Sequence, residues 1–140
     1  MKKILIAEDN PVNRELLREL LEARGYAIEE AVNGQEALHM IAQSKPDLLL
    51  LDLSMPVLDG FATLKKIRED ASMASLTVLA VTAYAMRGDQ EKAMGAGFDG
   101  YLTKPINSEL LDEALDRVWN KAIGTNINSE GQARAASNKY

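Results

Sequence analysis

The chain has 140 residues, contains no cysteine and carries a formal net charge of −5 at pH 7. This length suits one domain that buries roughly two-thirds of the surface of its unfolded chain. Without cysteine, disulfides and thiol chemistry are excluded. The negative charge argues against nucleic-acid binding, which relies on Lys and Arg to neutralise phosphates.

The chain shows no sign of membrane insertion. No apolar segment approaches the roughly 20 residues that a membrane-spanning helix needs. The N-terminal sequence begins with Met-Lys-Lys, but acids interrupt the following apolar stretch after four residues, which is typical of a strand and not of a signal peptide. We therefore expect a soluble protein, and a sequence without cysteine suits the cytoplasm.

Strand-like and helix-like patterns alternate along the chain. In chain order we expect a strand over residues 3–7, a helix that begins at Asn10-Pro11 and stops at Arg24-Gly25, a strand over 27–31, a helix over 34–44, a strand within 47–53, a helix over 61–69, a strand over 76–82, a helix over 87–96, a strand over 101–103 and a helix over 108–121. Such alternation predicts an α/β fold, a doubly wound five-stranded parallel sheet with helices on both faces.

The last residues differ in composition from the rest. Residues 122–140 are small, polar and nearly balanced in charge. Segments of this kind rarely bury enough apolar surface to become ordered. We therefore divide the chain into one domain over residues 1–121 and a flexible C-terminal tail over residues 122–140.

The third expected strand carries an unusual charge. Residues 47–53 read Asp-Leu-Leu-Leu-Leu-Asp-Leu, a run that suits a strand buried on both faces of a parallel sheet and that ends at Asp52. An unpaired buried carboxylate would take up a proton rather than stay ionised. We therefore expect Asp52 to lie exposed at the mouth of the strand, beside groups that give it a function.

Other polar residues also follow the expected strands. They are Glu8-Asp9 after the first strand, Thr82-Ala83 after the fourth and Thr103-Lys104-Pro105 after the fifth. Sites in open parallel sheets gather at the carboxyl ends of the strands. Three acids, one hydroxyl and one ammonium would therefore meet at one edge, provided that the strand order brings these strands together.

This group of residues has a chemical logic. Three neighbouring carboxylates favour a divalent cation, and oxygen ligands without His or Cys select a hard ion such as Mg²⁺, which Mn²⁺ or Ca²⁺ could replace in vitro. An aspartate beside such an ion can attack a phosphoryl group and form an acyl phosphate. Lys104 would then neutralise one phosphoryl oxygen, and Thr82 could donate a hydrogen bond to another.

Together these motifs resemble those of the receiver domains of two-component response regulators. The resemblance covers about residues 2–121 and rests on five motifs in order, namely Glu8-Asp9, Asp52, Met55-Pro56 with Asp59-Gly60, Thr82-Ala83 and Lys104-Pro105. It implies the flavodoxin- or CheY-like strand order 2-1-3-4-5. The segment 83–89 and residues 104–107 look most like receivers of hybrid kinases and of stand-alone DivK-type regulators.

The resemblance also implies a role for each site residue. Asp52 would accept phosphate from a histidine kinase or a histidine phosphotransfer protein, with Lys104, Thr82 and the backbone of Ala83 binding the phosphoryl group. Asp9 would bind Mg²⁺ directly and Glu8 directly or through water, with Asp52 and the backbone carbonyl of Ser54 completing the protein ligands. Tyr101 matches the aromatic switch residue that turns inward when Thr82 moves towards the phosphoryl group.

The resemblance further implies how such a protein signals. The surface of the fourth helix, fifth strand and fifth helix would contact a downstream protein, whereas the first helix, with Asn13, Arg14, Leu17 and Arg18, would contact the kinase. Ser54 and Tyr84 lie at positions that adjust the dephosphorylation rate in the family. Because the chain ends about twenty residues after the last helix, we expect a stand-alone phosphoacceptor that is no independent turnover enzyme.

Two other classes of function remain open at this point. An aspartate-nucleophile phosphohydrolase also places an Asp after an apolar strand, but it carries a second acid two residues on, where this chain has Ser54. A flavodoxin-like cofactor-binding module would need a phosphate-cradling loop after the first strand. Glu8-Asp9-Asn10 would repel a phosphate there unless a metal ion intervened.

Overall fold

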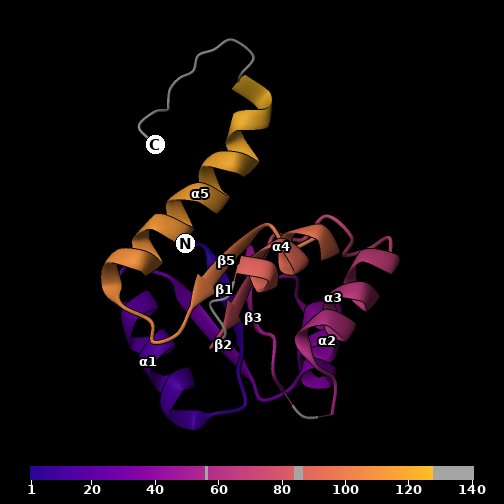
Figure 1. Cartoon of the computed structure of the whole chain (residues 1–140), viewed down its shortest axis with the longest axis horizontal. Helices are drawn as coiled ribbons and strands as arrows, with labels where there is room; N and C mark the ends of the chain where they lie inside the picture. Colours follow the sequence, from indigo (N-terminus) through magenta and orange to yellow (C-terminus); the bar gives the residue numbers. More distant parts are fainter. Residues whose placement is uncertain (56, 84–86, 128–140) are drawn as a thin grey trace.

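The computed structural model of the chain describes residues 1–55, 57–83 and 87–127 (Figure 1). Its elements in chain order are β1 (Lys3–Ala7), α1 (Pro11–Glu22), β2 (Ala27–Ala31), α2 (Gly34–Gln43), β3 (Leu48–Asp52), α3 (Gly60–Glu69), β4 (Val78–Thr82), α4 (Arg87–Ala96), β5 (Gly100–Thr103) and α5 (Ser108–Ile127). The alternation of strands and helices expected from the sequence is confirmed.

The five strands form one parallel sheet in the order β2-β1-β3-β4-β5. The predicted fold class and strand order are therefore correct. In this order β1, β3, β4 and β5 are successive neighbours, and all of their C-terminal ends lie at the same edge of the sheet because the strands are parallel. The chain reverses its direction of winding between β1 and β3, where ligand sites of open α/β sheets form.

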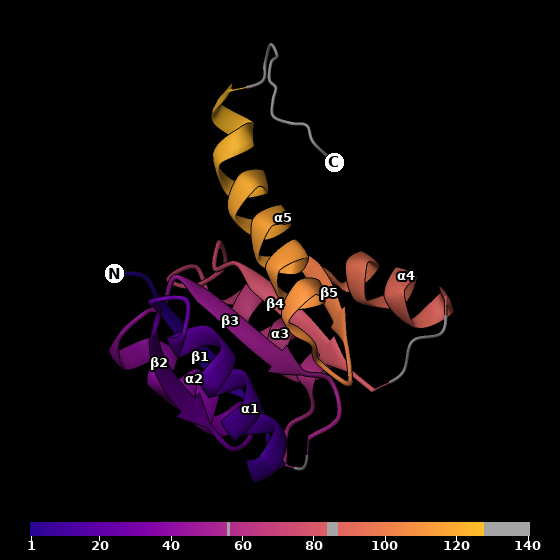
Figure 2. The same ribbon diagram turned by 90° about the vertical axis from the view of Figure 1, so that its left-hand side faces the viewer.

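Helices cover both faces of the sheet (Figure 2). Helices α1 and α5 pack on one face, whereas α2, α3 and α4 pack on the other. The leucine run of β3 contributes to the core on both faces. Leu48 and Leu50 pack beneath α1 and α5, whereas Leu49 and Leu51 pack beneath α2, α3 and α4. All four leucines are fully buried, which explains why this strand is continuously apolar and does not alternate.

Side-chain caps start the helices that follow β1 and β3. Asn10 accepts hydrogen bonds from the amides of Val12 and Asn13, and Pro11 occupies the first position of α1. At the start of α3, Asp59 accepts a hydrogen bond from the amide of Ala62 at 2.8 Å. Both arrangements satisfy amides that a helix leaves without a partner, so the helix starts follow directly from local sequence.

Several element boundaries differ from the sequence prediction, and two of the differences have a clear local cause. Helix α5 ends at Ile127 and not at residue 121, because Ala122 and its neighbours include no proline and one glycine costs only about 1 kcal/mol in a helix. Strand β4 begins at Val78 and not at residue 76, because the amide of Leu76 donates to the carbonyl of Met73 in the preceding turn. The rest of the predicted tail, residues 128–140, lies outside the described residues.

No helix within the described ranges is long and apolar enough to cross a membrane.

Gly60 allows α3 to begin directly against the end of β3. A Cβ at this position would lie 2.6 Å from the carbonyl oxygen of Asp52 and 2.7 Å from the Cα of Leu53. Both are backbone atoms and cannot move aside as a flexible side chain would. The Asp59-Gly60 motif is therefore a helix cap followed by a close backbone contact, which together fix the chain beside Asp52.

We expect Gly60→Ala to lower the free energy of unfolding by about 1–3 kcal/mol, as overpacking does in a close-packed interior. The measurement is urea denaturation followed by circular dichroism. Gly95→Ala in α4 is the matched control, because a Cβ there meets nothing within 4 Å and should be neutral or stabilising by up to about 1 kcal/mol. An unchanged midpoint for Gly60→Ala would contradict the close contact.

Candidate functional site

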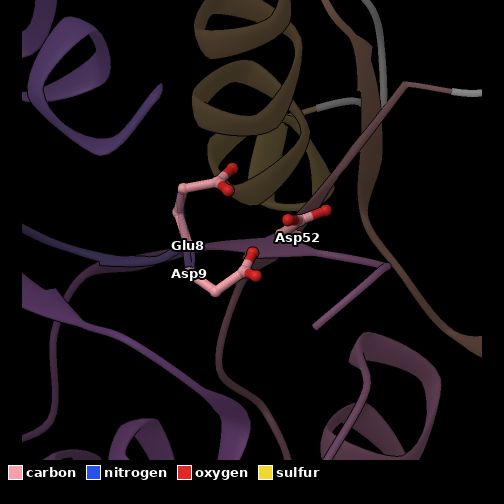
Figure 3. A group of neighbouring side chains, drawn as sticks. All are labelled: Glu8, Asp9 and Asp52. Carbon is pink, nitrogen blue, oxygen red and sulfur yellow. The ribbon is translucent and has the colours of Figure 1, made fainter. Parts of the chain in front are cut away.

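Three acids meet at the C-terminal edge of the sheet. Glu8 and Asp9 follow β1, and Asp52 is the last residue of β3 (Figure 3). Glu8 and Asp9 leave the end of β1 in different directions, yet one carboxylate oxygen from each of the three side chains lies within 4.8 Å of the others. The structure therefore brings together the three acids that the sequence placed at one edge.

Lys104 lies between two of these acids. Its Nζ is 2.9 Å from Oε1 of Glu8 and 3.3 Å from Oδ2 of Asp52, with which it forms a hydrogen bond. The lysine follows β5, and its own amide donates to the carbonyl of Thr82 at 2.7 Å. This backbone contact holds Lys104 over the ends of the neighbouring strands, so its ammonium reaches both carboxylates.

The expectation that Asp52 is exposed is wrong. Asp52 is only 3% exposed and Glu8 only 1% exposed, whereas Asp9 is exposed. Asp52 tolerates burial because each of its oxygens has a partner: Oδ2 accepts from Lys104, and Oδ1 accepts from the amide of Ser54 at 3.1 Å. These two contacts replace hydrogen bonds to water that the carboxylate loses on burial.

The electrostatics of the site leave Glu8 the less well satisfied acid. Burial raises the pKa of the Glu8 carboxyl, and the nearby charge of Asp52 acts in the same direction. The ion pair with Lys104 and the hydrogen bond from the amide of Asn10 to Oε2 oppose this shift without cancelling it. No hydrogen bond of suitable geometry from the described residues reaches Oε1 of Glu8, despite the nearby ammonium.

Lys104 shows the opposite balance. Burial by itself would lower its pKa, but the ion pair with Glu8 and the charge of Asp52 outweigh that effect and raise it. The cluster thus contains three carboxylates and one ammonium, which contacts two of them, so an excess of negative charge remains. Oxygen donors in this number, without nitrogen or sulfur ligands, fit a hard divalent cation.

The other predicted site residues lie around this cluster. Thr82 ends β4 and is 1% exposed, and the exposed Ala83 follows it. Tyr101 is half-buried on β5, where it packs against the core cluster beneath α2, α3 and α4. Ser54 is placed by its amide hydrogen bond to Asp52. Tyr84, the second position expected to adjust dephosphorylation, lies outside the described residues.

One of the four residues predicted to form a kinase-binding surface on α1 is buried. Leu17 is 1% exposed and packs in the core, so it is not available to a partner. Arg14 and Arg18 both pair with Glu30 of β2. Arg14 also donates to the backbone carbonyl of Glu8 at 2.9 Å. Sequence reasoning missed this contact, because no spacing rule links a helix residue to the carbonyl of a preceding strand end.

Comparisons with known proteins agree with this geometry. The family model described as the response regulator receiver domain matches residues 4–116. The polar-differentiation response regulator DivK of Brucella anthropi is 40% identical over 114 residues, which are 81% of this chain and 93% of that protein. The chain therefore belongs to the receiver domain family of response regulators.

Two solved structures extend the comparison. The chemotaxis response regulator CheY4 of Vibrio cholerae is 30% identical, with a TM-score of 0.79 over 84% of this chain and 98% of that one. The receiver domain of the sensor histidine kinase PA1611 from Pseudomonas aeruginosa is 34% identical, with a TM-score of 0.76 over 83% of this chain and 95% of that one. That receiver domain holds a magnesium ion coordinated in its active-site cleft.

We expect Asp9→Asn to stabilise the protein in the absence of divalent cations. The change removes one of three clustered like charges while Lys104 keeps both of its partners. Relief of one repulsion near a protein surface is worth about 1 kcal/mol or more. The measurement is urea denaturation in a chelating buffer.

The control for Asp9→Asn is Asp116→Asn, which changes the net charge equally at an exposed position of α5. It should shift the unfolding midpoint far less. A lower midpoint for Asp9→Asn than for the wild type would show that the exposed carboxylate makes a net favourable contact, contrary to the expectation.

Proposed function

We propose that Asp52 accepts a phosphoryl group from a phosphohistidine of a histidine kinase or of a histidine phosphotransfer protein. The observation that carries this proposal is the position of its carboxylate at the C-terminal edge of the sheet, where it contacts Lys104 and lies within 4.8 Å of oxygens of Glu8 and Asp9. Family membership supports the same reaction class. The chain assists its own phosphorylation and dephosphorylation and is not an independent turnover enzyme.

The proposed step is a displacement at phosphorus. A carboxylate oxygen of Asp52 attacks the phosphoryl group, the bond between phosphorus and the imidazole nitrogen breaks, and its electron pair stays with the imidazole of the donor. The product is an acyl phosphate on Asp52. Both carboxylate oxygens of Asp52 already accept hydrogen bonds. These bonds fix the orientation of the carboxylate towards the incoming phosphohistidine.

Glu8, Asp9, Asp52 and the backbone carbonyl of Ser54 would hold Mg²⁺, with Glu8 bound directly or through water. When bound, this ion supplies positive charge for the spread negative charge of the transferring group. The fit rests on three carboxylate oxygens within 4.8 Å of one another and on the poorly satisfied Oε1 of Glu8. In vitro, Mn²⁺ or Ca²⁺ would bind to the same oxygen ligands.

The remaining groups bind the phosphoryl oxygens. Lys104 exchanges part of its contact with Asp52 for a phosphoryl oxygen, and the hydroxyl of Thr82 and the amide of Ala83 donate to the others. The C-terminal ends of β3, β4 and β5 are adjacent, so these donors lie around one point. Because they are held by the sheet, little reorganisation is needed during the reaction.

The proposed output is a change on the surface formed by α4, β5 and α5. Thr82 moves towards the phosphoryl group and Tyr101 turns inward, which shifts an existing equilibrium between two conformations. Tyr101 lies in a hollow between α4 and α5, together with Gln90, Met94 and Arg117. A downstream protein would read this surface by direct binding. The proposal places the protein in the cytoplasm, which suits a sequence without cysteine.

The first test is phosphorylation by a small acyl phosphate. Wild-type protein with Mg²⁺ should gain one phosphoryl group by intact mass, whereas Asp52→Asn should gain none, because an amide oxygen cannot form the stable acyl phosphate. Addition of a chelator should abolish the adduct on the wild type.

Two results would contradict this proposal. One is a wild-type protein that gains no phosphoryl group with Mg²⁺, and the other is an Asp52→Asn variant that is modified as fully as the wild type. Steady hydrolysis of many phosphate esters would favour the aspartate-nucleophile phosphohydrolase instead. A purified protein that carries flavin or nucleotide would favour the cofactor-binding module.

A second test concerns the hydroxyl of Thr82. Thr82→Ala should slow phosphorylation roughly 10- to 100-fold, the range expected for loss of one hydrogen bond to a charged group. Thr82→Ser is the matched control, since it keeps the hydroxyl and should stay close to the wild-type rate. Rates are followed by intact mass over time. Equal slowing in both variants would indicate a packing role for the methyl group and not a donor role.

A further inference from the structure

Arg14 connects helix α1 to the backbone of the two acids that follow β1. Its Nη1 lies 2.9 Å from the carbonyl oxygen of Glu8 and 3.5 Å from the carbonyl oxygen of Asp9. Its Nε donates to Oε1 of Glu30 at 3.0 Å. The side chain is only 18% exposed, so these contacts are shielded from solvent and one guanidinium holds three acceptors.

The two carbonyls define the orientation of Asp9. One belongs to the peptide plane before its Cα and the other to the plane after it, and each plane is rigid. A donor held close to both oxygens limits rotation about the Cα of Asp9 and sets where its carboxylate points. The same plane links Asp9 to Glu8, so the relative placement of both side chains in Figure 3 depends on this segment of backbone.

Glu30 in turn holds the guanidinium. It lies on β2 opposite Ile6 of β1, within the paired part of the sheet, and accepts from both Arg14 and Arg18. These arginines lower the pKa of Glu30 despite the opposing effect of its burial, so it stays ionised. Arg14 is therefore fixed between a strand carboxylate and the loop that carries the acids.

We propose that Arg14 is a positioning residue for the cation site, with Glu30 as its anchor. The inference rests on the proposed function and deepens it: Arg14 makes no contact with the phosphoryl group or the ion, and acts by holding the backbone of Glu8 and Asp9 in the arrangement that places their carboxylates together. Residues that orient metal ligands in this way typically change metal affinity 10- to 100-fold when they are replaced.

The charge of Arg14 makes this proposal sharply testable. A guanidinium beside an acidic cluster repels a divalent cation, so removal of its charge alone would strengthen Mg²⁺ binding. Loss of positioning would weaken it. The two effects have opposite signs, and the direction of the change in affinity tells a positioning role from a merely electrostatic one.

Arg18 provides a matched control. It lies one helical turn further along α1 and pairs with the same Glu30, and also with Glu22 at 3.1 Å. Within the part of the chain that the structure describes, Arg18 does not donate to the carbonyls of Glu8 or Asp9. Arg18→Ala removes the same charge and a similar contact between α1 and β2 without affecting the backbone at the acids.

The experiment measures the dissociation constant of Mg²⁺ by calorimetry, and the unfolding midpoint without Mg²⁺, for the wild type and four variants. Arg14→Ala should bind Mg²⁺ at least roughly tenfold more weakly. Arg14→Lys and Glu30→Gln should show smaller losses in the same direction, since Lys keeps the charge but not the planar fork that spans carbonyl and carboxylate. Arg18→Ala should stay close to the wild type. Arg14→Lys also serves as the readout should Arg14→Ala fail to fold.

Two outcomes would overturn the inference while the proposed function stands: Mg²⁺ binding by Arg14→Ala that equals or exceeds that of the wild type, or equal weakening in Arg18→Ala. A purely structural role would lower the unfolding midpoint and leave the affinity unchanged, which also overturns it. Failure of the wild type itself to bind Mg²⁺ is a different result, because it contradicts the proposed cation site and with it this inference.

Discussion

A single ammonium shared by two buried carboxylates is the interaction on which the site depends. Glu8 and Asp52 are almost fully withdrawn from solvent, and Lys104 contacts both. Removal of charges from water is costly, and one cation compensates only part of the cost for two anions. The exposed Asp9 adds a third negative charge. The site is therefore incompletely neutralised by its own residues, and a cation or an incoming group that carries charge can change its balance.

The fold holds these groups against their mutual repulsion. Strand β3 is buried on both sides, so Asp52 cannot relax away without loss of apolar contacts that contribute several kcal/mol in all. Gly60 lets α3 begin close against its carbonyl, and the amide of Ser54 fixes its side chain. The repulsion is thus sustained by packing at some distance from the charges, as is common where structure serves function.

The sequence predicted those features that depend on local pattern. Periodicity gave the parallel sheet, and parallel strands imply that residues after β1, β3, β4 and β5 converge. It could not predict the burial of Asp52, because the group that makes burial tolerable, Lys104, comes from a residue 52 positions away. The hydrogen bond from Arg14 to the carbonyl of Glu8 could not be predicted either, because every residue has a backbone carbonyl and the sequence does not show which one accepts. The end of α5 was missed because a polar composition does not by itself stop a helix.

The sheet register also explains how an event at Asp52 could reach the surface of α4, β5 and α5. Ala80 of β4 lies opposite Tyr101 of β5, and Thr82 lies opposite Thr103. Residues two apart in a strand project from the same face, so Thr82 and Tyr101 are diagonal neighbours on one side of the sheet, within reach of a long aromatic side chain. In the proposed switch, a shift of Thr82 towards the acids would therefore change the space beside Tyr101 directly. The proposed switch needs no long chain of intermediates, because the two strands that carry it are hydrogen-bonded to each other.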